Sequence, residues 1–290
     1  MRSHSILRWL SIIGALCALL ALQGCSTVRL AYNNAPQLSY WWLDSYFDFD
    51  SAQTPRVRTE LQSLQDWHRK QELPLLEQQL DRLLTLAPQT ITPEQVCGVY
   101  GELQARAVAA LDNAAQTLAA TASSLQEPQI QRLQREFEKK DSEWREDWLE
   151  GTPQDRAERR LKKAVEWSES FYGALSDEQR DMLAARFSAS LFDPQVQHRE
   201  KLRRHQDLMA TLRAVRGQAP AQAQAALHAL LTRTVVSADP DYRQHLEKLV
   251  QENCSTVAAL HNSSTPRQRV RLAKTLQGYK GDAQALASAS

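Results

Sequence analysis

The chain has 290 residues, and its 35 Lys and Arg residues nearly balance 34 Asp and Glu residues. This balance, without a basic block, argues against nucleic-acid binding, which needs clustered Lys and Arg to displace counterions from phosphates. The length is sufficient for a sizeable core in one or two units, whereas the nine glycines form no phosphate-cradling cluster.

The first 24 residues have the layout of a secretory signal. Arg2 and Arg8 lie before an apolar run that extends from Trp9 to Leu22, and the positive end of such a segment stays on the cytoplasmic side. The apolar run is too short to span a membrane comfortably. We therefore predict that residues 1–24 are a signal peptide and that the mature chain is exported.

The end of the apolar run, "LQGC", resembles the lipobox of bacterial lipoproteins, whose cysteine carries diacylglycerol and acyl chains such as palmitate. Leu22, Gly24 and Cys25 match this pattern, whereas Gln23 stands where small residues are more usual. The resemblance implies lipidation of Cys25, and Ser26 after it implies the periplasmic side of the outer membrane. Several acyl chains make such an anchor effectively permanent, since each buried CH₂ contributes about 0.8 kcal/mol. The alternative is an ordinary signal peptide followed by a chance cysteine.

Residues 25–54 form a predicted lipidated N-terminal segment that is rich in aromatic side chains. Its stretch "YWWLDSYFDFD", Tyr40 to Asp50, contains six aromatic residues and three aspartates. A helix lying on a membrane normally carries Lys and Arg beside its aromatic residues. We therefore expect this segment to pack on the helical body, with aspartates facing water or capping helices. The alternative is an interfacial position, because Trp and Tyr favour the headgroup region.

Residues 55–279 form a predicted helical domain, because their apolar residues recur every three or four positions. No strand pattern of consequence interrupts them. Each apolar stripe must be buried against another, so the predicted fold is all-α, a multi-helix bundle or helical array of amphipathic helices. The repeated helix-start signal is a capping residue followed by proline. It occurs at Thr54, Thr92, Thr152, Asp193, Asp239 and Thr265.

Two further features concern the continuity of the helices. Pro74 cannot donate a helix hydrogen bond, so it should kink or divide the segment between Pro55 and Leu86. The last residues, 280–290, are too small and polar to pack, and we expect a disordered tail there.

Two of the four cysteines are available for a disulfide bond. Cys17 leaves with the signal and Cys25 carries lipid, which leaves Cys97 and Cys254. A disulfide between them fits an oxidising compartment, and it would contribute roughly 5 kcal/mol in the chain-entropy model. Two free buried thiols remain the alternative, because the sequence does not show that the Cα atoms approach.

The stretch "DWHRKQELP" places His68 and Glu72 one helical turn apart. A His with a carboxylate at this spacing can bind a metal or transfer protons. However, His68 falls on an apolar stripe, and a catalytic metal normally needs three protein ligands. We interpret His68 and Glu72 as a polar pair with a structural role, and an envelope hydrolase that uses His68 is the alternative.

Three short motifs recur along the chain. They are "ITPEQ" at residues 91–95, "LSDEQ" at 175–179 and "STPRQ" at 264–268. The first two resemble the Leu-Thr-x-x-Gln motif of small helical periplasmic chaperones, which cradle unfolded clients. The simpler interpretation is a capping box, in which the Gln side chain reaches back to the helix start.

The segment from Cys25 to Pro74 resembles a family of proteobacterial lipoproteins of unknown function. The shared features are the lipobox, a Tyr-Asn pair, an aromatic run, a Gln before the first long helix, and Trp-His-Arg followed by Glu-Leu-Pro. In this chain they are Tyr32, Asn33, Trp41 to Tyr46, Gln53, Trp67, His68, Arg69, Glu72, Leu73 and Pro74. The resemblance implies a periplasm-facing helical lipoprotein, and no known activity comes with it.

No motif of an enzyme stands out. The chain has no Gly-x-Ser-x-Gly elbow, P-loop, dinucleotide fingerprint or Cys-x-x-Cys pair. We therefore predict no catalytic residue, metal or cofactor. The expected function is a non-enzymatic binding or scaffold role in the cell envelope, with an envelope protein as partner or, alternatively, an unfolded client.

Overall fold

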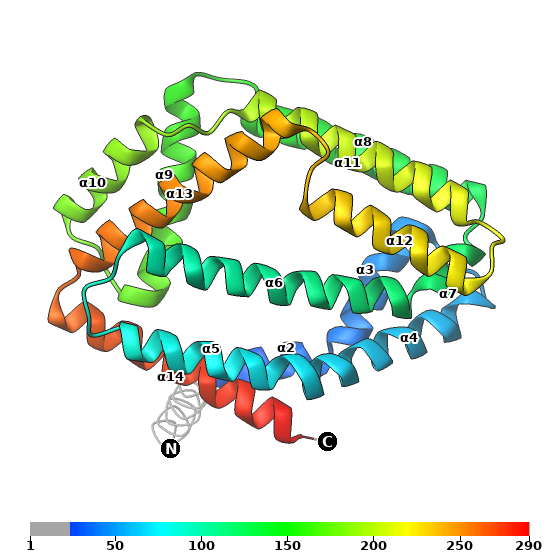
Figure 1. The fold of residues 1–290 in the computed structure, drawn as a ribbon, viewed down its shortest axis with the longest axis horizontal. Helices are drawn as coiled ribbons and strands as arrows, with labels where there is room; N and C mark the ends of the chain where they lie inside the picture. Colours follow the sequence, from blue (N-terminus) through cyan, green and yellow to red (C-terminus); the bar gives the residue numbers. More distant parts are fainter. Residues whose placement is uncertain (1–23, 290) are drawn as a thin grey trace, which may run out of the picture.

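The computed structural model describes residues 24–289, and no strand occurs in this range, which confirms the predicted all-α helical array. The helices follow one another around a ring (Figure 1). They are α2 (Gly24–Asn33), α3 (Ala35–Phe47), α4 (Gln53–Trp67), the π-helix η1 (His68–Glu72), α5 (Leu73–Leu86), α6 (Pro93–Thr117), α7 (Ala119–Ser124), α8 (Glu127–Trp148), α9 (Pro153–Tyr172), α10 (Asp177–Ser188), α11 (Pro194–Val215), α12 (Pro220–Val235), α13 (Pro240–Asn262) and α14 (Pro266–Ser288).

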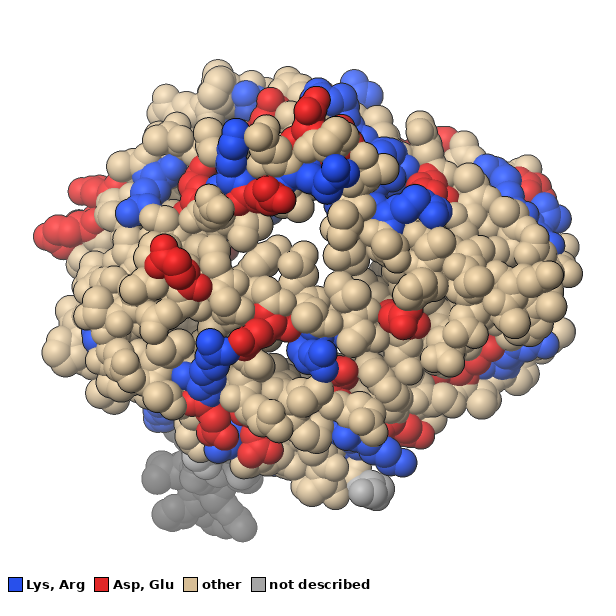
Figure 2. All heavy atoms as spheres, viewed as in Figure 1, with Lys and Arg blue, Asp and Glu red and all other residues tan. Residues whose placement is uncertain are grey.

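The ring encloses space that side chains do not fill. Figure 2 shows an opening through the molecule in the region bounded by α6, α12 and α13. The predicted signal peptide, residues 1–24, lies outside the described residues except for Gly24. Cys25 follows it in the first turn of α2.

Most of the predicted helix starts are capped by the expected side chain. Thr92, Thr152 and Thr265 accept a hydrogen bond from the backbone N–H at the third helical position, and Asp193 and Asp239 cap their helices in a related way. Each of these side chains satisfies a backbone donor that the helix itself leaves unpaired.

The predicted cap at Thr54 is wrong. Helix α4 begins at Gln53, two residues before Pro55, and Asp50 bonds the N–H groups at its start. The Asp50 carboxylate accepts hydrogen bonds from the N–H groups of Ala52 and Gln53, both at 2.8 Å. Thr54 instead lies 3.1 Å from the hydroxyl of Tyr40. The carboxylate of Asp50 reaches the first-turn donors, so the hydroxyl of Thr54 is left to hold the aromatic segment.

The helix that contains Pro74 is divided, as predicted. It ends at Trp67, passes through the π-helix η1 and resumes at Leu73. The N–H of Leu73 bonds to the carbonyl of His68, five residues back, in place of the usual four. Proline lacks an N–H and crowds the preceding turn. The wider turn of η1 accommodates Pro74, so the helical path continues directly from α4 into α5.

The N-terminal segment packs on the helical body along one side only. Tyr40 of α3 is buried in a cluster with Val57 and Leu61 of α4. Tyr46 and Phe47 pack against the largest core cluster, which is built from α7, α8, α11 and α12. The outward side of α3 stays exposed.

The predicted disordered tail at residues 280–290 is wrong. Helix α14 continues to Ser288, with Asp282, Ala283 and Leu286 buried. It lies along α5 (Figure 1). Small side chains at this end of the chain allow close approach of two helices, so a polar and alanine-rich composition was a poor indicator of disorder here.

Two pairs of glutamines join helix starts that lie far apart in the sequence. Gln179 of α10 and Gln268 of α14 each donate the side-chain amide to the other's carbonyl oxygen, at 3.1 and 2.9 Å. Gln53 of α4 and Gln129 of α8 make the same exchange at 3.1 and 2.7 Å. In each pair both amides also donate to backbone carbonyls where neighbouring helices end. These reciprocal hydrogen bonds fix four helix starts in pairs.

The three short motifs are therefore not equivalent. All three form capping boxes, which confirms that interpretation. In addition, "LSDEQ" and "STPRQ" contribute Gln179 and Gln268, which meet in the buried pair. Gln95 of "ITPEQ" is exposed and hydrogen-bonds only within its own box.

Replacing Gln268 should destabilise the fold more than replacing Gln95. Gln268→Ala removes a capping bond and leaves the buried amide of Gln179 without its partner, so we expect a loss of about 2–3 kcal/mol in the free energy of unfolding. Gln95→Ala removes only the exposed capping bond and should cost about 0.5–1 kcal/mol. Urea unfolding of both variants measures the difference, and equal losses would contradict a stabilising role for the pair.

Candidate functional site

One side of the ring encloses a large cavity. Its volume is about 750 Å³, and its walls come from α2, α5, α6, α9, α13 and α14, with η1 and α10 also contributing. Cavities that bind small ligands in proteins typically measure about 300–1,000 Å³. The cavity is therefore large enough for a ligand with many heavy atoms.

The walls of the cavity are almost entirely hydrocarbon. They include Leu76 of α5, Leu103 of α6, Trp167 of α9 and Val257 of α13. These side chains are reached by solvent, and Trp167 is 62% exposed. Each Å² of apolar surface that stays in contact with water costs the folded protein about 25 cal/mol relative to burial. Apolar surface gathered in a concavity is typical of a binding site.

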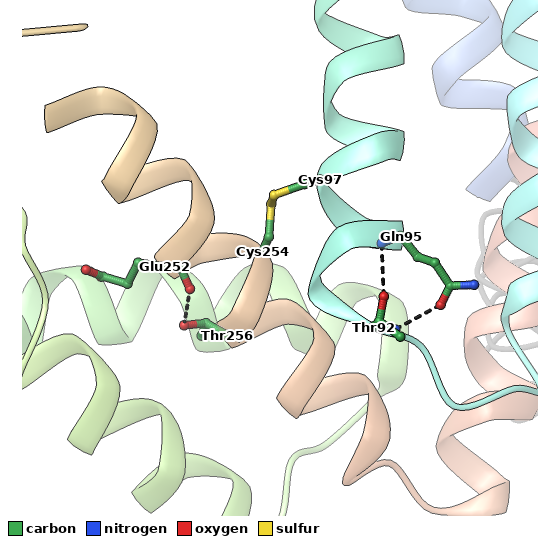
Figure 3. The surroundings of a disulfide bond; sticks show 6 residues. All are labelled: Thr92, Gln95, Cys97, Glu252, Cys254 and Thr256. Carbon is green, nitrogen blue, oxygen red and sulfur yellow. Dashed lines mark hydrogen bonds between the residues drawn. A yellow bond between two sulfur atoms is a disulfide. The ribbon is translucent and has the colours of Figure 1, made fainter. Parts of the chain in front are cut away.

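A disulfide bond spans the wall between α6 and α13. It joins Cys97 to Cys254, whose Cα atoms are 5.5 Å apart and which are separated by 157 residues in the sequence. Figure 3 shows the bond crossing between the two helices, close to the Thr92–Gln95 capping box at the start of α6. Val257, one turn after Cys254, lines the cavity. The bond therefore sets the spacing of two cavity walls.

Two tyrosine–histidine pairs are among the polar groups of the walls. The hydroxyl of Tyr32 lies 2.9 Å from Nδ1 of His68, and the hydroxyl of Tyr172 lies 2.9 Å from Nδ1 of His261. All four side chains line the cavity. In both pairs the polar atoms face each other, so each wall satisfies its own hydrogen bonds without a ligand.

The second pair is held in one protonation state. The Nε2–H of His261 donates to the backbone carbonyl of Gln89 at 2.8 Å, because a carbonyl can only accept. Nδ1 is then the acceptor, and the hydroxyl of Tyr172 donates to it. Burial lowers the pKa of His261 and raises the pKa of Tyr172 to about 12. Both groups are neutral at neutral pH.

His68 and Glu72 interact with different partners in the structure. His68 hydrogen-bonds to Tyr32, whereas the buried carboxylate of Glu72 lies 3.7 Å from the guanidinium of Arg106. Burial lowers the pKa of His68, and the charge of Glu72 opposes that shift. Among residues 24–289 no group of three His, Cys, Asp or Glu side chains is placed to hold a metal ion. His68 thus belongs to the cavity wall with Tyr32.

Sequence reasoning singled out His68 but missed Tyr32, Tyr172 and His261 as members of the same site. The available signal was a polar-tipped aromatic residue on an otherwise apolar stripe. Tyr172 and His261 each fall on such a stripe, 89 residues apart. Only the closed ring brings them to one wall.

The family of the chain follows from a comparison of its sequence with known families. Residues 45–243 match the Family of unknown function (DUF6279), and the chain belongs to that family. No curated protein and no solved structure matches the chain. In the described part of the chain, no helix combines the length and the apolar character that crossing a membrane requires.

The neutral state of His261 predicts a loss of stability in mild acid. The folded state holds the pKa of His261 below its ordinary value of about 6.5, so the unfolded chain binds a proton first as the pH falls. The free energy of unfolding should therefore fall below about pH 6.5, by up to about 1.4 kcal/mol per pH unit for this one group. Urea unfolding at a series of pH values should show a shallower decline for His261→Gln. Identical slopes for the two proteins would contradict the assignment.

Proposed function

We propose that this protein is a non-enzymatic binding protein of the cell envelope, anchored through lipid on Cys25, and that its cavity holds an apolar ligand with a long hydrocarbon chain. The observation that carries the proposal is the solvent-reached apolar cavity of about 750 Å³. Its two histidines are each hydrogen-bonded to a tyrosine of the walls, which supports a binding role.

The chemistry of the walls favours a hydrocarbon chain over a polar ligand. The tyrosine and histidine atoms already satisfy one another, which leaves the side-chain oxygen of Gln79 as a buried polar atom of the wall without a partner, so a polar ligand would lose more hydration than these walls replace. Each buried CH₂ group contributes about 0.8 kcal/mol. A hydrocarbon chain with ten such groups gains roughly 8 kcal/mol, which is of the order of the free-energy cost of association. Each further buried CH₂ group then adds to the net affinity. Recognition would rest on shape and apolar contact.

The position of the proposed anchor supports a link to lipid. Cys25 lies in α2, one turn before Val28, and Val28 and Tyr32 line the cavity. The lipobox-like "LQGC" and the charged, apolar leader support lipidation of this cysteine, and Ser26 supports the periplasmic side of the outer membrane. The cavity wall thus begins within one helical turn of the attachment point.

The lipid anchor can be tested on the cysteine itself. Cells that grow with labelled palmitate should incorporate the label into the wild-type chain, and Cys25→Ser should abolish incorporation because the acylated thiol is gone. Cys17→Ser is the matched control, because it changes a cysteine inside the signal peptide and should leave labelling intact. Labelling that survives in Cys25→Ser, or a mature N-terminus at another residue, would contradict the proposal.

The cavity can be tested by filling it from one wall. Val257 points into the cavity from α13, whereas Val270 of α14 is 71% exposed and lies outside it. In a form of the protein that starts at Ser26, Val257→Trp should weaken palmitate binding about tenfold, because it displaces roughly two methylene groups. Val270→Trp should bind palmitate like the wild type.

Equilibrium dialysis with labelled palmitate measures both variants. If neither the wild type nor Val270→Trp binds palmitate, the hydrocarbon ligand is excluded. Binding of an unfolded polypeptide instead, weakened by Val257→Trp, would favour the chaperone-like alternative.

A further inference from the structure

Helix α3 presents an apolar stripe to the outside of the molecule. Leu38, Trp41 and Trp42 are spaced by three and four residues and therefore lie on one side of the helix. Trp41 is 59% exposed and Trp42 is 61% exposed. Two neighbouring tryptophans at this exposure leave a large area of apolar surface in water.

The stripe is not the result of loose packing, because the opposite side of α3 is firmly held. Tyr40 is buried between α3 and α4, and its hydroxyl lies 3.1 Å from that of Thr54. The guanidinium of Arg58 lies over the ring of Tyr40, 4.2 Å from its centre, and also donates to the side chain of Gln37. The helix is fixed in rotation, so the tryptophans point outward.

The aspartates near the stripe have hydrogen-bond or ion-pair partners within the chain. The Asp44 carboxylate accepts the N–H of Phe49 at 2.9 Å, and Asp50 caps the start of α4. Asp48 forms an ion pair with Arg132 at 3.1 Å. The guanidinium of Arg132 offsets the charge of Asp48, whereas Asp44 and Asp50 keep their charge but are held by backbone N–H groups. The aspartates therefore weigh less against a position of α3 at the membrane interface than the sequence alone indicated.

The place of the stripe in the chain points to its partner. Helix α2 begins at Gly24, where the apolar run and the lipobox-like motif end. On α2, Leu30 is also exposed. The bend between α2 and α3 is supported: Pro36 cannot donate to the carbonyl of Tyr32, and the side chain of Gln65 donates to it instead. The exposed apolar residues of α2 and α3 thus lie directly after the proposed lipid-attachment site, on two helices whose relative orientation is fixed.

We propose that Leu30, Leu38, Trp41 and Trp42 form a membrane-contact face that rests in the headgroup region of the phospholipid bilayer that holds the N-terminus. Tryptophan suits this position because its ring is largely apolar and its N–H can bond to headgroups or water. The face would orient the ring on the bilayer. The proposal uses the proposed anchor for its location, but it does not depend on a ligand in the cavity.

Contact with lipid can be measured on the full chain reconstituted into phosphatidylcholine vesicles. Lipids with bromine atoms near the headgroup end of their acyl chains quench tryptophans that touch them. The double replacement Trp41→Phe and Trp42→Phe should lower the quenched part of the fluorescence at least about twofold, because these rings lie at the interface. Bromine atoms near the chain ends should quench less than those near the headgroups.

Trp148→Phe is the matched control, because Trp148 packs against Trp144 and Phe192 at the end of α8 and lines neither the cavity nor the α3 stripe. It should leave the lipid-quenched part unchanged. Vesicle flotation reports separately whether the chain is anchored. Flotation with the same lipid quenching in the double variant as in the wild type would overturn the membrane-contact face while leaving the anchor intact. In that case a protein partner would be the occupant of the stripe.

Discussion

The cavity depends on the contact between the two ends of the described chain, and an ion pair with a buried carboxylate fixes that contact. Asp282 of α14 is only 3% exposed, and its carboxylate lies 2.6 Å from the guanidinium of Arg29 in α2. A buried carboxylate without a partner would cost several kcal/mol, so this contact strongly disfavours arrangements in which α14 moves away. Arg69 of η1 adds a hydrogen bond to the carbonyl of Leu286. Because Asp282 and Leu286 also line the cavity, the interactions that close the ring also build one of its walls.

The sequence predicted the helices well because helix starts are local events. A Thr or Asp followed by proline needs only its own first turn to act, and five of the six such signals cap a helix. The exception, Thr54, failed because Asp50 bonds the N–H groups of Ala52 and Gln53, so the helix starts before Thr54. The break at Pro74 was equally predictable, since a missing N–H acts on the preceding turn whatever surrounds it.

The cavity and the end of α14 could not be predicted, because they depend on contacts between distant segments. An apolar stripe shows that a helix side avoids water, but it does not show whether another helix covers it or whether it faces a cavity. Trp167 and Val165 both lie on α9, yet Val165 is buried in a core cluster and Trp167 faces the cavity. Likewise, the alanine-rich end of α14 carries a weak pattern of its own. Its burial follows from the close fit with α5 and from the pairing of Asp282 with Arg29, partners that lie 253 residues apart.

The apolar cavity and the exposed apolar stripe described above meet at α2. Val28 and Tyr32 of this helix line the cavity, and Leu30 between them is exposed on the outside. A helix with apolar side chains on opposite sides cannot bury both sides against one core. Helix α2 therefore separates the cavity from the outer surface. If the outer side rests on a bilayer, the cavity is separated from the lipid by about one helix diameter, which is roughly 10 Å. A hydrocarbon chain passing between bilayer and cavity would then cross little water. This proximity would make the lipid around the proposed anchor the most accessible source of the proposed ligand.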